Sequence, residues 1–209
     1  SQDYWCRMYN LHLLSQYRDR ECYFHERDRS RSAAEQKLAG SQSTVSIIID
    51  AMHQGKFSVP RHLPGAKMLK DCLRPKLHVV GIIAHGVFKI GWVADPTLAK
   101  DSNLFIELMA RALQMIQVAC AKRHIKFPAR CNLFADNASD NKNQYAFSMY
   151  ALLIATRMFD VVSACFLRTG HNHEDQDAMF GMWSRFLAVQ TTLQTPWAFV
   201  VALRQHFPD

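Results

Sequence analysis

Two short apolar runs in this chain each end in an aspartate and have the length of a buried strand. Residues 45–49 read VSIII and precede Asp50, while residues 131–135 read CNLFA and precede Asp136. Nearly continuous apolar runs of this length are typical of strands covered on both faces of a sheet. Such strands need helices on both sides, which favours an α/β fold.

The remaining segments predict the order of the elements. Residues 77–84 and 87–93 flank His85 and Gly86, which indicates a β-hairpin. Patterns further along predict helices over 103–123, 144–158, 173–189 and 196–206, and a strand over 161–167. Right-handed crossovers place later parallel strands on one side of the first strand and the hairpin on the other. We therefore expect a mixed five-stranded sheet, order 3-2-1-4-5, flanked by helices.

The N-terminal segment has a different character. Apolar residues among charges over 4–38 suit one or two amphipathic helices ending near Gly40. Residues 18–31 alternate in charge sign, which favours a solvated helix face. We divide the chain into an N-terminal helical arm, or the remnant of an upstream domain, over 1–40 and one domain over 41–209. The start is neither a methionine nor a signal sequence, so we expect a fragment of a longer protein.

Composition narrows the partners. The chain has 209 residues, a formal charge of +7 and six scattered cysteines without a CxxC pair, which favours reduced intracellular thiols. No run of about 18 apolar residues is present, so we expect no membrane partner. Two basic patches would hold a phosphate backbone or serve solubility alone. They contain Arg61, Lys67, Lys70, Arg74 and Lys76, and Lys122, Arg123, Lys126 and Arg130.

The segment GHNHEDQDAMFG, residues 170–181, places two histidines and three carboxylates within seven residues. Aspartates at strand ends often form turns, and acids favour the start of a helix. Here the acids recur at matching strand ends, and Asp177 lies one turn into the next helix. Three acids on three elements suit a two-metal phosphoryl-transfer site, because hard cations take carboxylate oxygens.

The element order over residues 45–189, with these acids, resembles the RNase H-like fold of ribonuclease H, retroviral integrases and DDE/DDD transposases. The phrases DAMHQGK from Asp50, DN followed by NKN from Asp136, and GHNHEDQDAMFG are similar to a family of transposase-derived RNase H-like domains. Their typical texts are D-G-M-D-Q-x-K, D-N-x-x-x-x-N-K-N and G-H-T-H-x-D-x-D-x-x-F-G. His53 stands where that family often has a second aspartate, which weakens the case for full activity.

The resemblance implies catalytic and metal-ligand roles. Asp50, Asp136 and Asp177 would bind Mg²⁺ or Mn²⁺, two ions in an active enzyme. Glu174 competes with Asp177 for the third role, and we expect Asp175 to point away. The histidines His171 and His173 would shape the site, orient substrate or assist proton transfer, or else only organise the turn.

The polar turn over residues 136–143 has two compatible interpretations. It caps the following helix, or Lys142 and the amides hold a phosphate beside the metal. The leading hypothesis is a nuclease or DNA strand-transfer domain, nuclear and able to form homo-oligomers, with Lys67, Lys70, Arg74, Lys142, Lys122 and Arg123 as nucleic-acid contacts. The alternatives are a catalytically inactive, domesticated nucleic-acid-binding or assembly module, and a metal-dependent small-molecule hydrolase.

Overall fold

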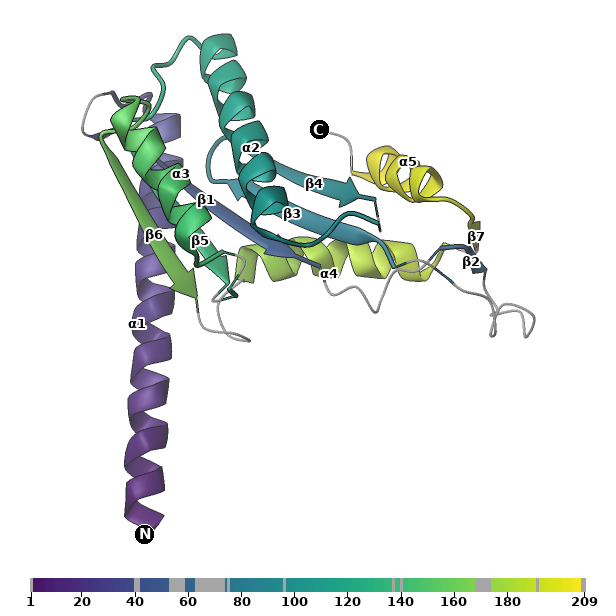
Figure 1. Ribbon diagram of the computed structural model, residues 1–209, viewed down its shortest axis with the longest axis horizontal. Coiled ribbons are helices and arrows are strands. Elements are labelled where there is room, and N and C mark those ends of the chain that lie inside the picture. The colour runs from purple at the N-terminus through teal and green to yellow at the C-terminus, as the bar shows by residue number, and fades with distance from the viewer. Residues whose placement is uncertain are drawn as a thin grey trace.

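The computed structural model describes residues 2–39, 42–52, 59–62, 74, 76–95, 97–136, 138–139, 141–167, 174–190 and 192–207. Five strands form the main sheet in the order β4-β3-β1-β5-β6 (Figure 1). Their bounds are β1 Thr44–Ala51, β3 His78–Ala84, β4 Phe88–Ala94, β5 Arg130–Asp136 and β6 Val161–Leu167. Because β3 and β4 pair antiparallel while β1, β5 and β6 run parallel, the predicted mixed sheet and its order are confirmed.

Helices cover both faces of this sheet. The helices α2 (Ser102–Lys122) and α3 (Gln144–Ala155) pack on one face, and α1 (Gln2–Glu35), α4 (Glu174–Ala188) and α5 (Pro196–His206) lie on the other. Strand β1 serves both layers because its side chains alternate: Ile47 and Ile49 pack toward α2, and Ile48 toward α4. The main sheet therefore sits inside a three-layer α/β domain.

Helix α2 is the one described helix long and apolar enough to cross a membrane by length and composition. Its apolar side instead packs on the sheet, which is typical of a core helix. Asp101 caps it by accepting from the backbone N–H groups of Asn103 and Leu104. The final helix begins as predicted, with Pro196 in its first turn and Thr195 as the cap.

Two glycines let α4 approach the sheet closely. A Cβ on Gly81 of β3 would lie 1.6 Å from Gln176 Nε2, and one on Gly91 of β4 would lie 2.3 Å from the Trp183 ring. A side chain at Gly91 would require the Trp183 ring to move, and one at Gly81 would displace the side-chain ends of Gln176 and Met179. A third glycine, Gly86, has φ of +79° in the hairpin turn that the sequence predicts.

The N-terminal segment forms one continuous helix whose two halves differ. Its second half packs on β1, burying Tyr23, Ser30 and Ala33. Arg18, Glu21, Asp28 and Arg29 are exposed, which agrees with the solvated face predicted for residues 18–31. The opposite side of the helix completes the layer under the sheet. The domain boundary at residue 40 stays a prediction.

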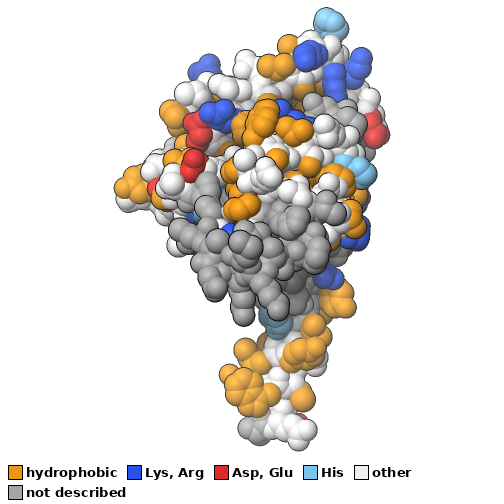
Figure 2. Space-filling model, turned by 90° about the vertical axis from the view of Figure 1, so that its right-hand side faces the viewer, with side chains coloured by type: hydrophobic (Ala, Val, Ile, Leu, Met, Phe, Trp, Pro, Cys, Tyr) orange, Lys and Arg blue, Asp and Glu red, His pale blue; other side chains and the backbone are white. Residues whose placement is uncertain are grey.

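The first half of α1 projects away from the sheet, and Figure 2 shows hydrophobic side chains along this projecting end. Successive helix positions differ by about 100°, so the exposed apolar residues lie all around the helix and form no single stripe. They are Tyr4, Trp5, Met8, Tyr9, Leu11, Leu14 and Tyr17.

A short ribbon of β2 (Arg61–His62) and β7 (Thr192–Leu193) was not predicted from the sequence.

Candidate functional site: a pocket with two acids

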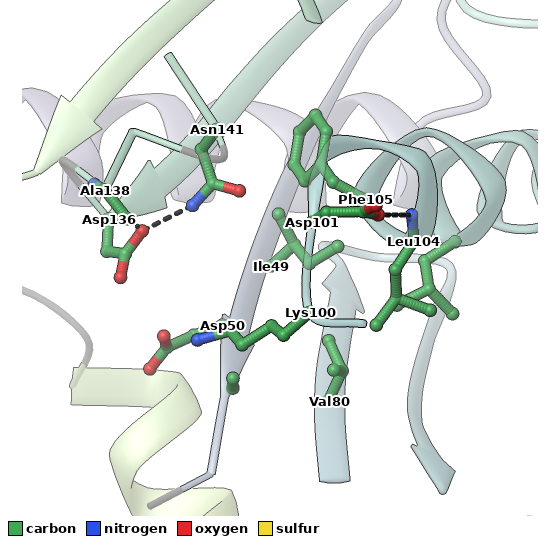
Figure 3. Close-up of a pocket in the computed structure, with 12 residues that line it drawn as sticks. Ile49, Asp50, Val80, Lys100, Asp101, Leu104, Phe105, Asp136, Ala138 and Asn141 are labelled. Atoms are coloured by element: carbon green, nitrogen blue, oxygen red, sulfur yellow. Dashed lines mark hydrogen bonds between the residues drawn. The ribbon is translucent and has the colours of Figure 1, made fainter. Parts of the chain in front are cut away.

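A pocket lies at the carboxyl ends of β1 and β5, where the two central strands run parallel. Ile49 is level with Ala135, so the next residues, Asp50 and Asp136, follow at the same edge of the sheet. Both acids line the pocket, together with residues from the start of α2 (Figure 3). Its volume is about 40 Å³, enough for a few water molecules or ions because one water needs about 10–15 Å³. We call it the two-acid pocket.

The Asp136 carboxylate is held through one of its oxygens. Its Oδ1 accepts hydrogen bonds from the backbone N–H of Ala138 (3.3 Å) and from the side-chain amide of Asn141. For Oδ2 the described residues offer no hydrogen-bond donor. The turn after β5 therefore orients Asp136 through Oδ1, and among the described residues no donor occupies Oδ2.

A third acid of the pocket, Asp101, has a different task. Its Oδ1 accepts from the N–H groups of Asn103 (2.9 Å) and Leu104 (3.1 Å), and Oδ2 accepts from the Asn103 amide (3.3 Å). Both oxygens are thus committed to the start of α2. Asp50 and Asp136 are the pocket's candidates for binding a cation.

Lys100 also lines the pocket, and in Figure 3 its side chain extends toward Asp50. Lys100 was not predicted from the sequence as a site residue. The capping pattern at Asp101 indicates where α2 begins, but nothing local to residues 95–101 shows that this helix start lies beside β1.

The structure separates the acids of the segment after β6. Asp177 lies on α4 with its side chain exposed and does not line the pocket. Helix α4 begins at Glu174, whose side chain is outside the described residues, as are His171, His173 and His53. Within the described part of the chain, no group of three histidine, cysteine or acidic side chains is close enough to hold a metal. The predicted roles of Asp177, Glu174 and the two histidines stay predictions.

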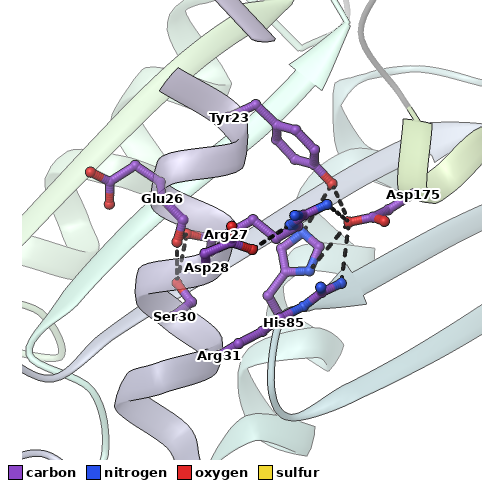
Figure 4. Close-up of polar contacts among 9 residues, drawn as sticks. Tyr23, Glu26, Arg27, Asp28, Ser30, Arg31, His85 and Asp175 are labelled. Atoms are coloured by element: carbon purple, nitrogen blue, oxygen red, sulfur yellow. Dashed lines mark hydrogen bonds and ion pairs between the residues drawn. The ribbon is translucent and has the colours of Figure 1, made fainter. Parts of the chain in front are cut away.

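Asp175 belongs to a separate site between α1 and α4 (Figure 4). Its Oδ2 accepts the Tyr23 hydroxyl proton at 3.0 Å and lies 3.6 Å from Arg27 Nη1 and 3.4 Å from Arg31 Nη2. His85, 2% exposed, places Nε2 at 3.1 Å from the same hydroxyl. We call these five residues the Asp175 cluster. As predicted, Asp175 points away from the acids at the strand ends.

Burial controls protonation in this cluster. Desolvation lowers the pKa of His85 to about 4, although the Asp175 carboxylate opposes the shift. Desolvation also raises the pKa of Tyr23 above its ordinary value, and Asp175 adds to that effect. His85 is therefore neutral near pH 7. Because Tyr23 donates to Asp175, we assign the proton of His85 to Nε2, which leaves Nδ1 without a hydrogen-bond partner among the described residues.

The polar turn before α3 caps that helix, as one of its two interpretations predicts. Asn143 accepts from the N–H groups of Tyr145 and Ala146, so these groups are not open to a phosphate. Lys142 is exposed and places Nζ 5.6 Å from the centre of the Phe166 ring. Its contact with a phosphate stays a prediction.

The predicted nucleic-acid contacts lie in different places. Lys67 and Lys70 are outside the described residues, and Arg74 is exposed. Lys122 and Arg123 lie at the opposite end of α2 from Asp101, about 30 Å away along the helix axis. Arg123 donates to the carbonyl oxygens of Gly86 (2.8 Å) and Val87 (3.2 Å), so it ties α2 to the hairpin turn.

Comparison with known proteins agrees with this architecture. A Mos1 transposase in a paired-end complex with the left transposon end aligns with 88% of this chain and 55% of its own, at 9% identity and a TM-score of 0.50. The catalytic domain of Mos1 mariner transposase aligns with 88% of this chain and 81% of its own, at 12% identity and a TM-score of 0.48. The HTLV-2 integrase catalytic core domain in complex with magnesium aligns with 78% of this chain and 83% of its own, at 12% identity and a TM-score of 0.40.

The sheet order and the likeness to the Mos1 transposase of the paired-end complex define an RNase H-like fold. Residues 67–208 match a family described as a domain of unknown function, DUF7869. This match spans more than half of the sequence, and the chain belongs to that family. No curated protein matches the sequence.

Proposed function

We propose that this chain is a metal-dependent nucleic-acid phosphoryl-transfer domain, a nuclease or strand-transfer domain acting on DNA. The observation that carries the proposal is the meeting of Asp50 and Asp136 in one pocket at the carboxyl ends of adjacent parallel strands. Ligand sites of open α/β sheets favour this edge. In this proposal the two carboxylates are the ligands of the cation.

The residues present fit Mg²⁺ or Mn²⁺. Both ions prefer carboxylate oxygens, and the pocket offers Asp50 and the Oδ2 atom of Asp136. When bound there, such ions supply a Lewis acid for the phosphate and an activated water or 3′-hydroxyl. The chain's own contribution is to hold Asp136 by Asn141 and to present both acids at a single edge.

The position of Asp177 supports it as the third acid. The backbone N–H of His85 donates to the carbonyl oxygen of Ser46 in β1. Gly81 pairs with Asp50, which lies nearer the carboxyl end of the same strand. On α4, Asp175 lies beside His85 and Gln176 lies beside Gly81. Because each helical residue turns by about 100°, Asp177 falls on the flank opposite Asp175. That flank is the one nearer the carboxyl end of β1, where Asp50 lies.

Lys100 favours the second candidate function, an inactive nucleic-acid-binding or assembly module. Its ammonium group lines the same pocket as the two acids and would offset their charge without a metal. In an inactive module the acids and Lys100 would form a structural charge cluster. DNA binding would then be independent of divalent cations.

An activity assay separates the two functions. We expect the wild-type chain with Mn²⁺ to cleave or join labelled DNA. Asp50→Asn should reduce the rate at least about a hundredfold, because losing even the partners of metal ligands typically costs about 10- to 100-fold. Asp160→Asn is the matched control, since this exposed acid precedes β6 at the opposite edge of the sheet.

DNA binding with no response to Mn²⁺ and no effect of Asp50→Asn would support the inactive module. Replacing Lys67, Lys70 and Arg74 together should weaken DNA binding, with a smaller dependence on salt, if these residues contact phosphates.

A further inference from the structure

Gln176, in the first turns of α4, is fully buried, and its amide has no hydrogen-bond partner among the described residues. Its exposed fraction is 0%, and neither Nε2 nor Oε1 is bonded. Two other buried polar side chains on this face of the sheet are paired: Ser30 donates to Ser46 Oγ, and Asn132 to Glu26. A buried amide with both ends unpaired is rare in folded proteins and calls for a reason.

The location of this amide supplies the reason. Gln176 Nε2 lies 1.6 Å from where a Gly81 Cβ would be, so the amide takes the space of the missing Gly81 side chain. Gly81 pairs directly with Asp50 in the β1–β3 register. Ile48 and Ile83, a pair two residues away, pack toward α4, so the Asp50–Gly81 pair points to the same face.

The amide is thereby within reach of the Asp50 carboxylate. Paired residues in an antiparallel ladder have Cβ atoms about 4.5–5.5 Å apart, and a carboxylate extends beyond its Cβ. Helix α4 contacts β1, and in Figure 3 the Asp50 carboxylate lies beside a helix ribbon with the colour of α4. An apolar side chain would fill the same space without burying an unpaired amide.

We propose that Gln176 is the positioning residue of Asp50: its amide N–H donates to the Asp50 carboxylate and aims that acid at Asp136 when a divalent cation binds. This inference rests on the proposed function, because it needs a cation in the two-acid pocket. Hydrogen bonds of this kind are often long before the ligand is present and tighten when it binds.

Calorimetric titration of the full chain with Mn²⁺ tests the inference. Gln176→Met keeps an unbranched side chain of similar size but removes the amide. We expect Mn²⁺ affinity to fall about 10- to 100-fold, as for other partners of metal ligands. The metal-free protein should melt at the same or a higher temperature, because an unpaired buried amide is gone.

Met179→Leu is the matched control. Met179 lies on the same helix against the same glycine, with its Cε 2.6 Å from the Gly81 Cβ position, but it carries no hydrogen-bonding group. We expect its Mn²⁺ affinity to equal that of wild type. A loss of affinity equal to that of Gln176→Met would show that packing alone is responsible and would overturn the inference.

The remaining outcomes separate this inference from the proposed function. If Asp50→Asn abolishes Mn²⁺ binding but Gln176→Met binds as tightly as wild type, Gln176 only packs and the proposed function stands. If wild type binds no Mn²⁺, both fail. Should Gln176→Met not fold, Gln176→Leu replaces it. Loss of folding in both variants would show that the amide has a structural partner, which would also overturn the inference.

Discussion

The two-acid pocket and the Asp175 cluster use the same side-chain chemistry in opposite ways. In the cluster, a tyrosine and two arginines surround a single carboxylate oxygen of Asp175 and join α4 to α1. In the pocket, the described part of the polar turn holds one oxygen of Asp136, and Asp50 and Asp136 both line one small cavity. The Asp175 carboxylate joins two helices and so stabilises the fold, whereas Asp50 and Asp136 meet at one edge of the sheet, where they would bind a cation.

The first residues of α4 also differ from one another in their surroundings. Three consecutive positions of α4 have three environments: Asp175 joins the cluster, Gln176 is buried against Gly81, and Asp177 is exposed. Only the helical turn of about 100° per residue separates them. Acids that are adjacent in the sequence can therefore belong to different sites, depending on how their helix packs.

The largest expected effect concerns His85 and the pH dependence of stability. The pKa of His85 in the folded chain, about 4, lies below the ordinary histidine value of 6.5, so the unfolded chain binds more protons between these values. Stability should therefore be full above pH 6.5 and fall as pH drops toward 4, by up to about 3 kcal/mol. The groups facing His85 are Tyr23, Asp175, Arg27, Arg31 and Lys89.

Urea unfolding of wild type and His85→Gln across this pH range measures the effect. The variant has no imidazole to protonate, so its profile should be flatter by that amount. Parallel profiles for the two proteins would mean that His85 is charged in the folded state.

The next effect is the change in the free energy of unfolding when an acid of each region is replaced. Asp175→Ala leaves the buried Tyr23 hydroxyl without its acceptor and two arginines without their carboxylate, so the free energy of unfolding should fall by about 2 kcal/mol. Asp50→Asn should leave it unchanged or raise it without metal, because one of two neighbouring charges is removed. Urea denaturation of both variants checks this. Equal destabilisation by the two changes would remove the distinction between the regions.

The smallest effect concerns the amide that orients Asp136. Asn141→Ala should weaken Mn²⁺ binding about tenfold, since the carboxylate loses a hydrogen-bonding partner. Asn143→Ala is the control: it removes the α3 cap, which should cost about 1 kcal/mol of stability, with Mn²⁺ affinity unchanged. Calorimetry and thermal melting together separate the two effects, and a stronger loss of affinity in Asn143→Ala would contradict this account of the turn.

Much of the sheet could be predicted because its signals are local. The apolar run of β1, the hairpin around Gly86 and the helical spacing of α2 each lie within one element, and the crossover rule then orders the strands. The meeting of Asp50 and Asp136 follows from that order. The ribbon of β2 and β7 has two residues per strand, too few to give a periodic signal.

The Asp175 cluster and the role of Gln176 could not be predicted in this way. Tyr23 and Asp175 are 152 positions apart, and their contact depends on how α1 and α4 cross beneath the sheet. Gln176 stands in a run of polar residues, EDQD, and only the space above Gly81 explains its burial. Sequence patterns indicate which face of an element is apolar but not which polar side chain fills a gap between two elements.

The central claim is that Asp50 and Asp136 bind a divalent cation together. Crystals of the full chain soaked in Mn²⁺, measured for anomalous scattering, test it most directly. The account predicts an anomalous peak between the two carboxylates, within about 2.0–2.3 Å of an oxygen of each, as hard cations require. A peak bound by His171 or His173 without Asp50 and Asp136, or no peak with Lys100 paired to Asp50, would contradict it.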